Sequence, residues 1–255
     1  MKTIFFTDLD NTIIYSHRRE MPAEKQVVEY WQGREQSYMT RKTMRFLQAF
    51  SRQPGHFLVP VTTRSREQYL RITGLQALHC PYALIYNGAL LLKNGVSDPQ
   101  WEADSLREAG EALRELPGLY EAMRPFVPPE HLHAALPYMV FAKTEDPLPL
   151  MQTLTGLCRG KGIQVVYSAT KLYCIPEAFN KGTAARRLSR RLSPDACILA
   201  AGDSEFDRPL LQEADIAFAP RSLSPQAKGK TVLFPDGFFS DALCDEMQKL
   251  LSSDA

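Results

Sequence analysis

The 255-residue sequence has almost no excess of charge of either sign, with 30 lysines and arginines against 29 aspartates and glutamates. A chain this close to neutrality lacks the overall positive field that holds nucleic acids or anionic membrane surfaces. It also lacks any run of about 18 apolar residues, the length that a membrane-spanning helix needs. These absences favour a small-molecule ligand over nucleic acid or a membrane.

Cysteine is also scarce and unpatterned. The five cysteines are widely spaced, and none forms a C-x-x-C pair that would suggest zinc or a redox dithiol, so we expect reduced structural thiols. The chain reaches the charged residue Asp8 almost at once, without the apolar segment of a signal peptide. We therefore expect a cytoplasmic protein.

Short apolar runs that end at polar residues recur along the chain, and such runs are typical of strands buried on both faces of a parallel sheet. They lie at residues 3–7, 57–62, 83–86, 197–201, 216–219 and 231–234. Helical spacing between them, as at residues 40–53, implies parallel crossovers. The pattern predicts an α/β fold with a doubly wound parallel sheet.

That alternation is interrupted in the middle of the chain, where the pattern predicts helices at residues 104–116 and 149–158 and strands at 138–142, 163–167 and 171–175. We therefore expect an inserted α+β cap domain at residues 89–173, with the core formed by residues 1–88 and 174–255. A strand, turn and strand at about residues 25–39 predict a β-hairpin flap close to Asp8 and Asp10.

Polar groups follow the predicted core strands: Asp8 and Asp10 the first, residues 62–64 the second, Asn87 the third, and residues 202–207 a later one. Each alone is equally compatible with a turn or a helix cap. However, the carboxyl ends of parallel strands meet at one edge of a sheet, so several acids would face one cleft. Close carboxylates repel unless a cation compensates them, and Mg²⁺ prefers oxygen ligands and often accompanies phosphate.

The order of these groups resembles a known family. Asp8-Leu9-Asp10-Asn11-Thr12 matches the D-x-D-x-T signature of the haloacid dehalogenase-like (HAD) phosphohydrolases, and residues 61–64, 180–182 and 202–207 resemble the second, third and fourth motifs. Asn87-Gly88-Ala89 resembles the junction at which Cof-like and sucrose-phosphate-phosphatase-like members enter a large α+β cap. The resemblance implies a Rossmann-like HAD core with an inserted cap.

The resemblance also implies an activity: a Mg²⁺-dependent phosphatase that hydrolyses a small phosphorylated metabolite, such as a sugar phosphate, through an aspartyl-phosphate. Asp8 would be the nucleophile, and Asp10 would act first as acid and then as base. Thr62 and Lys181 would complete the catalytic set. The residues implied to contact phosphate or substrate are Leu9, Thr63, Arg64 and Asn87, and those implied to hold Mg²⁺ are Asp8, Asp10, Asp203 and Asp207.

Two positions depart from the family pattern, with Thr63 where glycine is common and Ser204 where asparagine is usual. Arg64 could contact the phosphate or pair with Asp207. The candidate specificity residues of the cap are Tyr138, Tyr167, Lys171 and Tyr173. Three alternatives stay open: a phosphomutase with the same aspartyl-phosphate, a receiver-like signalling module, and a sugar-phosphate binder without catalysis.

Overall fold

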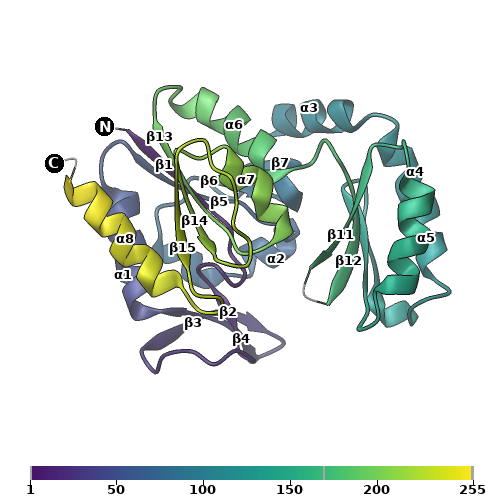
Figure 1. Ribbon diagram of the computed structural model, residues 1–255, viewed down its shortest axis with the longest axis horizontal. Helices are drawn as coiled ribbons and strands as arrows, with labels where there is room; N and C mark the ends of the chain where they lie inside the picture. The colour runs from purple at the N-terminus through teal and green to yellow at the C-terminus, as the bar shows by residue number, and fades with distance from the viewer. Residues whose placement is uncertain (1, 169, 254–255) are drawn as a thin grey trace.

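A five-stranded parallel sheet forms the centre of the computed structural model, which describes residues 2–168 and 170–253 (Figure 1). The strand order is β15-β14-β13-β1-β5, and each neighbouring pair is parallel. The strands are β1 (Thr3–Thr7), β5 (His56–Pro60), β13 (Cys197–Ala201), β14 (Ile216–Pro220) and β15 (Lys230–Phe234). Because the chain order differs from the spatial order, the crossovers carry helices onto both faces, which confirms the doubly wound fold.

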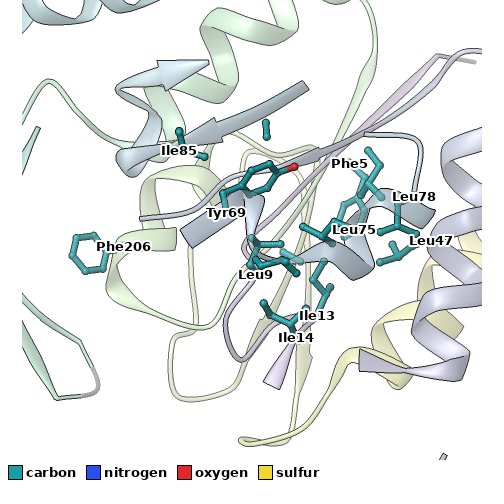
Figure 2. Packing of buried hydrophobic residues seen from close by; sticks show 14 of the residues in the cluster. Phe5, Leu9, Ile13, Ile14, Leu47, Tyr69, Leu75, Leu78, Ile85 and Phe206 are labelled. Carbon is teal, nitrogen blue, oxygen red and sulfur yellow. The ribbon is translucent and has the colours of Figure 1, made fainter. Parts of the chain in front are cut away.

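Alternate side chains of β1 enter two different hydrophobic clusters, because neighbouring residues of a strand point to opposite faces. Phe5 joins the cluster of α1 (Arg41–Arg52) and α8 (Ser240–Ser253), part of which is shown in Figure 2. Ile4 and Phe6 join the cluster of α6 (Lys181–Leu192) and α7 (Arg208–Gln212). None of the helices that the structure describes is long and apolar enough to cross a membrane.

The third predicted core strand is attached differently from the others. β6 (Tyr82–Ile85) meets the parallel sheet through one bridge, Val61 to Leu84, and pairs antiparallel with β7 (Leu90–Lys93), which pairs with β8 (Val96–Ser97). The strand predicted at residues 83–86 is thus present, and it joins the core sheet through this parallel bridge and not through a full ladder. The chain reverses directly after β6, in a turn where Asn87 and Gly88 have positive φ, so β6 pairs with its own continuation.

The predicted hairpin is confirmed. β3 (Lys25–Trp31) and β4 (Arg34–Thr40) are antiparallel, and β4 also pairs with the short β2 (Tyr15–Ser16). The two connecting residues, Gln32 and Gly33, have φ of 50° and 74°. Positive φ at both central positions is what a tight two-residue hairpin turn requires.

A second layer of structure forms the cap. Its antiparallel sheet has the order β11-β12-β10-β9, and α4 (Ala112–Met123) and α5 (Leu148–Cys158) cover the face away from the core (Figure 1). The strands are β9 (Leu132–Ala135), β10 (Met139–Lys143), β11 (Ile163–Ser168) and β12 (Lys171–Pro176). A separate hydrophobic cluster fills the space between this sheet and its helices.

The expected single helix at residues 104–116 is wrong. α3 (Pro99–Ala109) ends at Gly110, whose φ is 50°, and α4 starts anew at Ala112. α3 packs with the core, since its fully buried Trp101 belongs to the cluster of α6 and α7. The domain limits at residues 88 and 173 stay a prediction.

Candidate active site

A cavity of about 380 Å³ lies between the carboxyl ends of the core strands and the cap sheet. The core side contributes acidic and basic groups, whereas the cap side contributes aromatic and polar groups. The core residues include Asp8, Asp10, Lys181, Asp203 and Ser204, and the cap residues are Phe141, Ser168, Lys171 and Tyr173. The polar ends of distant strands thus share one cavity, as the sequence predicted.

The chain leaves strand geometry directly after Asp8. The carbonyl oxygen of Leu9 accepts hydrogen bonds from the N–H groups of residues 12, 13 and 14, and Asn11 has a φ of 59°. In a regular strand, Asp8 and Asp10 would point to the same face but lie two residues apart along the strand. This tight turn instead folds the chain back on itself, and both carboxylates line the cavity.

Lys181 bridges two buried carboxylates. Its Nζ donates to Asp8 Oδ1 at 2.6 Å and to Asp207 Oδ1 at 2.5 Å. The lysine is the first residue of α6, and Asn180 caps that helix by accepting a hydrogen bond from the N–H of Thr183 at 2.8 Å. The cap therefore determines where α6 begins and where its lysine enters the site.

The loop after β13 is organised around the other oxygen of Asp207. Asp207 Oδ2 accepts hydrogen bonds from the N–H groups of Asp203 and Ser204 and from the Ser204 hydroxyl, at 2.8 to 3.1 Å. A Cβ on Gly202 would lie 2.3 Å from Asp207 Cβ, so this position has no room for a side chain. Ser204, one of the departures from the family pattern, thus holds Asp207 in place.

The residues present fit a hard divalent cation. Carboxylate oxygens of Asp8, Asp203 and Asp207 lie within 4.8 Å of one another. All three donors are oxygens, which suits Mg²⁺. One lysine cannot neutralise three carboxylates, so the site keeps an excess of negative charge.

Burial and the excess of negative charge raise the pKa values of two of the three carboxyl groups, Asp8 and Asp203. Burial raises the pKa of Asp8 well above its ordinary value, and the nearby acids add to this while Lys181 opposes it. Burial and the charge of Asp207 raise the pKa of Asp203 to about 7. The carboxylates are thus costly to ionise together without a further positive charge.

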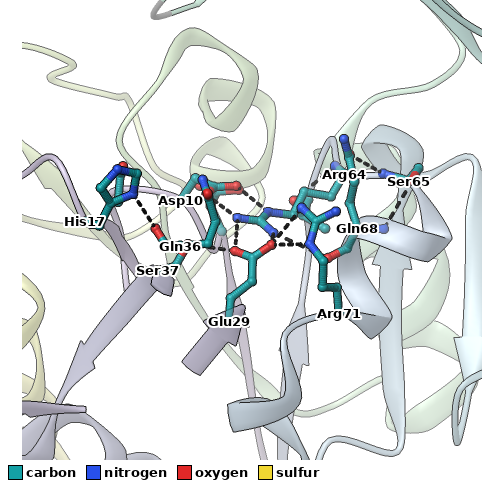
Figure 3. Close-up of polar contacts among 12 residues, drawn as sticks. Asp10, His17, Glu29, Gln36, Ser37, Arg64, Ser65, Gln68 and Arg71 are labelled. Atoms are coloured by element: carbon teal, nitrogen blue, oxygen red, sulfur yellow. Dashed lines mark hydrogen bonds and ion pairs between the residues drawn. The ribbon is translucent and has the colours of Figure 1, made fainter. Parts of the chain in front are cut away.

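Asp10 is compensated differently, by Arg64 (Figure 3). Arg64 Nε and Nη2 donate to the two oxygens of Asp10, each at 2.8 Å. Solvent exclusion raises the pKa of Asp10, but the hydrogen bonds and charge of Arg64 outweigh it, and the pKa lies below its ordinary value. The suggested pairing of Arg64 with Asp207 is wrong, since Asp207 pairs with Lys181.

The residues expected to contact phosphate are placed unequally. Thr63 and Arg64 line the cavity. The side chain of Leu9 lies in the hydrophobic core (Figure 2), so a phosphate contact from it would use its backbone. Thr62 is buried and accepts a hydrogen bond from the Arg64 N–H, while Asn87 Nδ2 donates to Phe179 O at 2.6 Å. Asn87 thus ties its turn to the segment before Lys181.

Two of the four candidate cap residues, Lys171 and Tyr173, line the cavity. Tyr167 instead packs against the cluster under the cap helices. Tyr138 stacks on Tyr86 with ring centroids 4.2 Å apart, and its hydroxyl donates to Glu102.

Sequence reasoning identified Tyr173 but missed the aromatic wall that it forms with His133, Phe141 and Phe206. Its neighbouring rings have centroids 4.7 to 5.2 Å apart. Phe141 stands opposite His133 and Tyr173 on adjacent strands, which brings their side chains to one face of the cap sheet. Residues 139–142 are all apolar, so no alternation in the sequence marks Phe141 as the one that faces the cavity.

Sequence reasoning also missed Glu29, a fully buried acid on β3 that accepts hydrogen bonds from Arg64, Arg71 and Ser37 (Figure 3). The signal was a single acidic residue inside an otherwise apolar and aromatic stretch, Val27-Val28-Glu29-Tyr30-Trp31. A buried carboxylate needs partners, and lysine or arginine side chains supply them most effectively.

The comparisons with solved structures find the same architecture over nearly the whole chain. A sucrose-phosphatase from Synechocystis sp. PCC6803 aligns with a TM-score of 0.64 and 19% identity, covering 98% of both chains. A haloacid dehalogenase-like hydrolase from Bacteroides thetaiotaomicron aligns with a TM-score of 0.61 and 15% identity, covering 98% of this chain and 100% of the other. At these identities the similarity establishes the fold.

A trehalose-6-phosphate phosphatase C-terminal domain from C. albicans shows the fold again, with a TM-score of 0.61 and 13% identity over 96% of this chain and 92% of that one. The comparison with curated proteins returns no match. The model of the sucrose-6F-phosphate phosphohydrolase family, in contrast, matches residues 1–218. The chain therefore belongs to the sucrose-6F-phosphate phosphohydrolase family of HAD-like phosphatases and is a phosphoric monoester hydrolase.

Proposed function

We propose that the protein is a Mg²⁺-dependent phosphatase that hydrolyses a small sugar phosphate through an aspartyl-phosphate on Asp8. The observation that carries the proposal is the contact of Lys181 with both Asp8 and Asp207, beside the Arg64-held Asp10. This arrangement supplies a nucleophile, a proton carrier and a cation in one cavity. Small sugar phosphates as substrates, Mg²⁺ as the metal and a cytoplasmic location are parts of this proposal.

In the first step, an oxygen of Asp8 attacks phosphorus while the bond between phosphorus and the leaving oxygen breaks. Arg64 lowers the pKa of Asp10 in the free protein, so this step requires Asp10 to take up a proton when the substrate binds. Asp10 then gives that proton to the leaving oxygen, and the sugar departs as a neutral alcohol. In the second step, Asp10 takes a proton from water, whose oxygen attacks phosphorus and releases phosphate from Asp8. The two carboxylates thus divide the chemistry: one forms the covalent bond and the other moves the proton.

The attack requires the ionised form of Asp8, and Lys181 is the neighbouring group that favours this form. Burial raises the pKa of Asp8, and the Lys181 ammonium at 2.6 Å opposes that rise. Mg²⁺ held by Asp8, Asp203 and Asp207 would neutralise the remaining negative charge and that of the phosphoryl group. Lys181 also limits the mutual repulsion of Asp8 and Asp207 before substrate binds.

The cap side of the cavity suits a sugar. Tyr173 and Phe141 present ring faces, and Ser168 and Lys171 present hydrogen-bond donors. Such a mixture of apolar wall and a few polar groups is typical of sites for small polar metabolites. Closure of the cap over the core would also exclude bulk water during the first step.

The test is phosphate release from 4-nitrophenyl phosphate and from a panel of sugar phosphates, with Mg²⁺ and with a chelator. We expect metal-dependent release that Asp8→Asn abolishes, and no change in Asp195→Asn, which alters an exposed aspartate elsewhere. Release that persists in Asp8→Asn would contradict the proposed nucleophile. Isomerised sugar phosphate without free phosphate would indicate a phosphomutase instead.

A further inference from the structure

The hairpin of β3 and β4 sends one charged side chain into the interior, and that side chain is Glu29. Its side chain has 0% exposure, although it belongs to a hairpin whose tip is open to solvent. Glu29 accepts hydrogen bonds from Arg64, from Arg71 at 2.8 Å and from the Ser37 hydroxyl at 2.6 Å. A carboxylate buried this completely requires such compensation.

A β-bulge explains how Glu29 reaches the interior. In the β3–β4 register, Val27 pairs with Tyr38 and Glu29 pairs with Ser37, so Val28 is an extra residue on β3. Neighbouring residues of a regular strand point to opposite faces, yet Val28 and Glu29 are both buried. Bulges next to active sites commonly redirect a side chain in this way.

The bulge is packed against the core at close range. A Cβ on Gly74, in the 3₁₀-helix η1 (Thr73–Ala77), would lie 2.5 Å from Val28 Cβ. Two residues after Glu29 on β3, the ring of Trp31 is covered by Arg71, whose Cζ lies 4.3 Å from the ring centroid. The hairpin therefore holds Glu29 in a defined position relative to both arginines.

Arg64 has no N–H group to spare in this arrangement. Its Nε and Nη2 bind Asp10, its Nη1 and Nη2 bind the two oxygens of Glu29 at 2.9 and 3.1 Å, and Nη1 also binds Gln68 O. These contacts account for all five donors of a guanidinium. Glu29 thus binds one edge of the planar guanidinium of Arg64 and fixes its orientation, and the other edge binds Asp10 (Figure 3).

We propose that Glu29 is a positioning residue that orients the proton-carrying Asp10 through Arg64. The inference rests on the proposed function, in which Asp10 protonates the leaving oxygen. Glu29 borders the cavity, but both of its carboxylate oxygens are engaged by Arg64, Arg71 and Ser37. Its effect therefore passes through the two parallel hydrogen bonds from Arg64 to Asp10. Without Glu29, the guanidinium rotates or shifts, and the Asp10 carboxyl loses its fixed orientation.

The test compares two leaving groups in Glu29→Gln. A sugar phosphate needs a proton on its leaving oxygen, whereas 4-nitrophenolate leaves as a stable anion. Because general-acid catalysis contributes about 10²- to 10⁴-fold, a misplaced Asp10 lowers kcat/KM on the order of 10²-fold for the sugar phosphate. For 4-nitrophenyl phosphate the loss is at least about tenfold smaller. The ratio kcat/KM reports the first step, in which the leaving group departs.

Three further variants make the result unambiguous. Asp10→Asn provides the reference pattern, with the larger loss on the sugar phosphate. Glu35→Gln is the matched control, because Glu35 lies on the same hairpin but is exposed and accepts its hydrogen bond from Tyr38; both kcat/KM values stay unchanged there. Ser37→Ala removes only the hydroxyl bound to Glu29, and it shows the same ordering of the two esters with a smaller loss, even where Glu29→Gln fails to fold.

Equal losses on the two esters in Glu29→Gln and Ser37→Ala would overturn the inference, because a general structural defect does not discriminate between leaving groups. The proposed function fails in a different way. In that case the unaltered protein hydrolyses neither ester in the presence of Mg²⁺, whatever residue occupies position 29.

Discussion

The ammonium group of Lys181 lies 2.6 Å from Oδ1 of Asp8, although 173 positions separate the two residues in the chain. The same ammonium lies 2.5 Å from Asp207 Oδ1, and all three side chains are almost completely removed from solvent. One cation between two buried acids is a stable arrangement only while all three are present.

We expect Lys181→Met to lower the free energy of unfolding by about 3 to 5 kcal/mol at pH 8, because it leaves two buried carboxylates without their cation. The matched control is Lys161→Met, which removes an exposed pair with Glu115 and costs less than about 1 kcal/mol. Urea unfolding in the presence of a chelator measures both. Equal losses in the two variants would show that Lys181 does not compensate buried charge.

The affinity for Mg²⁺ should weaken as the pH falls through about 7. Burial raises the pKa of Asp203 to about 7, so this carboxyl takes up a proton below that pH, and a metal must then displace it. The increase in Tm that Mg²⁺ produces over chelator-treated protein should therefore grow from pH 6 to pH 8. Asp203→Asn should remove most of this pH dependence, and a Tm increase independent of pH in the unaltered protein would contradict the prediction.

Gly202→Ala should impair the site through packing alone. The added Cβ would lie 2.3 Å from Asp207 Cβ, so Asp207 must move away from Lys181 and from the N–H groups it binds. We expect a loss of about 1 to 3 kcal/mol in unfolding free energy and a weaker dependence of activity on Mg²⁺. Gly118→Ala is the control, because no atom lies within 4 Å of the added Cβ and alanine favours the α4 helix.

Lys171→Met should raise KM for a sugar phosphate roughly tenfold, since a hydrogen bond from a charged donor to the leaving group is lost. Acetyl phosphate, whose leaving group is too small to reach the cap, should keep its KM. The control is Lys143→Met, because Lys143 stands opposite Lys171 in the cap sheet but is exposed and outside the cavity lining. Steady-state kinetics on both substrates distinguish a leaving-group contact from a contact with the phosphoryl group, which would raise both KM values.

The sequence by itself determined which residues would meet at the catalytic end of the core. Asp8, Lys181, Asp203 and Asp207 follow or begin elements of one parallel sheet, and the carboxyl ends of such strands share an edge whatever the details of packing. Their convergence thus follows from strand order and polar endings alone.

The tertiary structure decided which side chains face one another across the elements. Tyr167 and Tyr173 both lie in cap strands, but only Tyr173 faces the cavity, because a shift of one residue in a strand moves a side chain to the opposite face. The pairing of Arg64 with Glu29 likewise depends on register, because a bulge at Val28 turns Glu29 inward. Register and bulges arise from contacts between distant segments, so no local pattern in the sequence contains them.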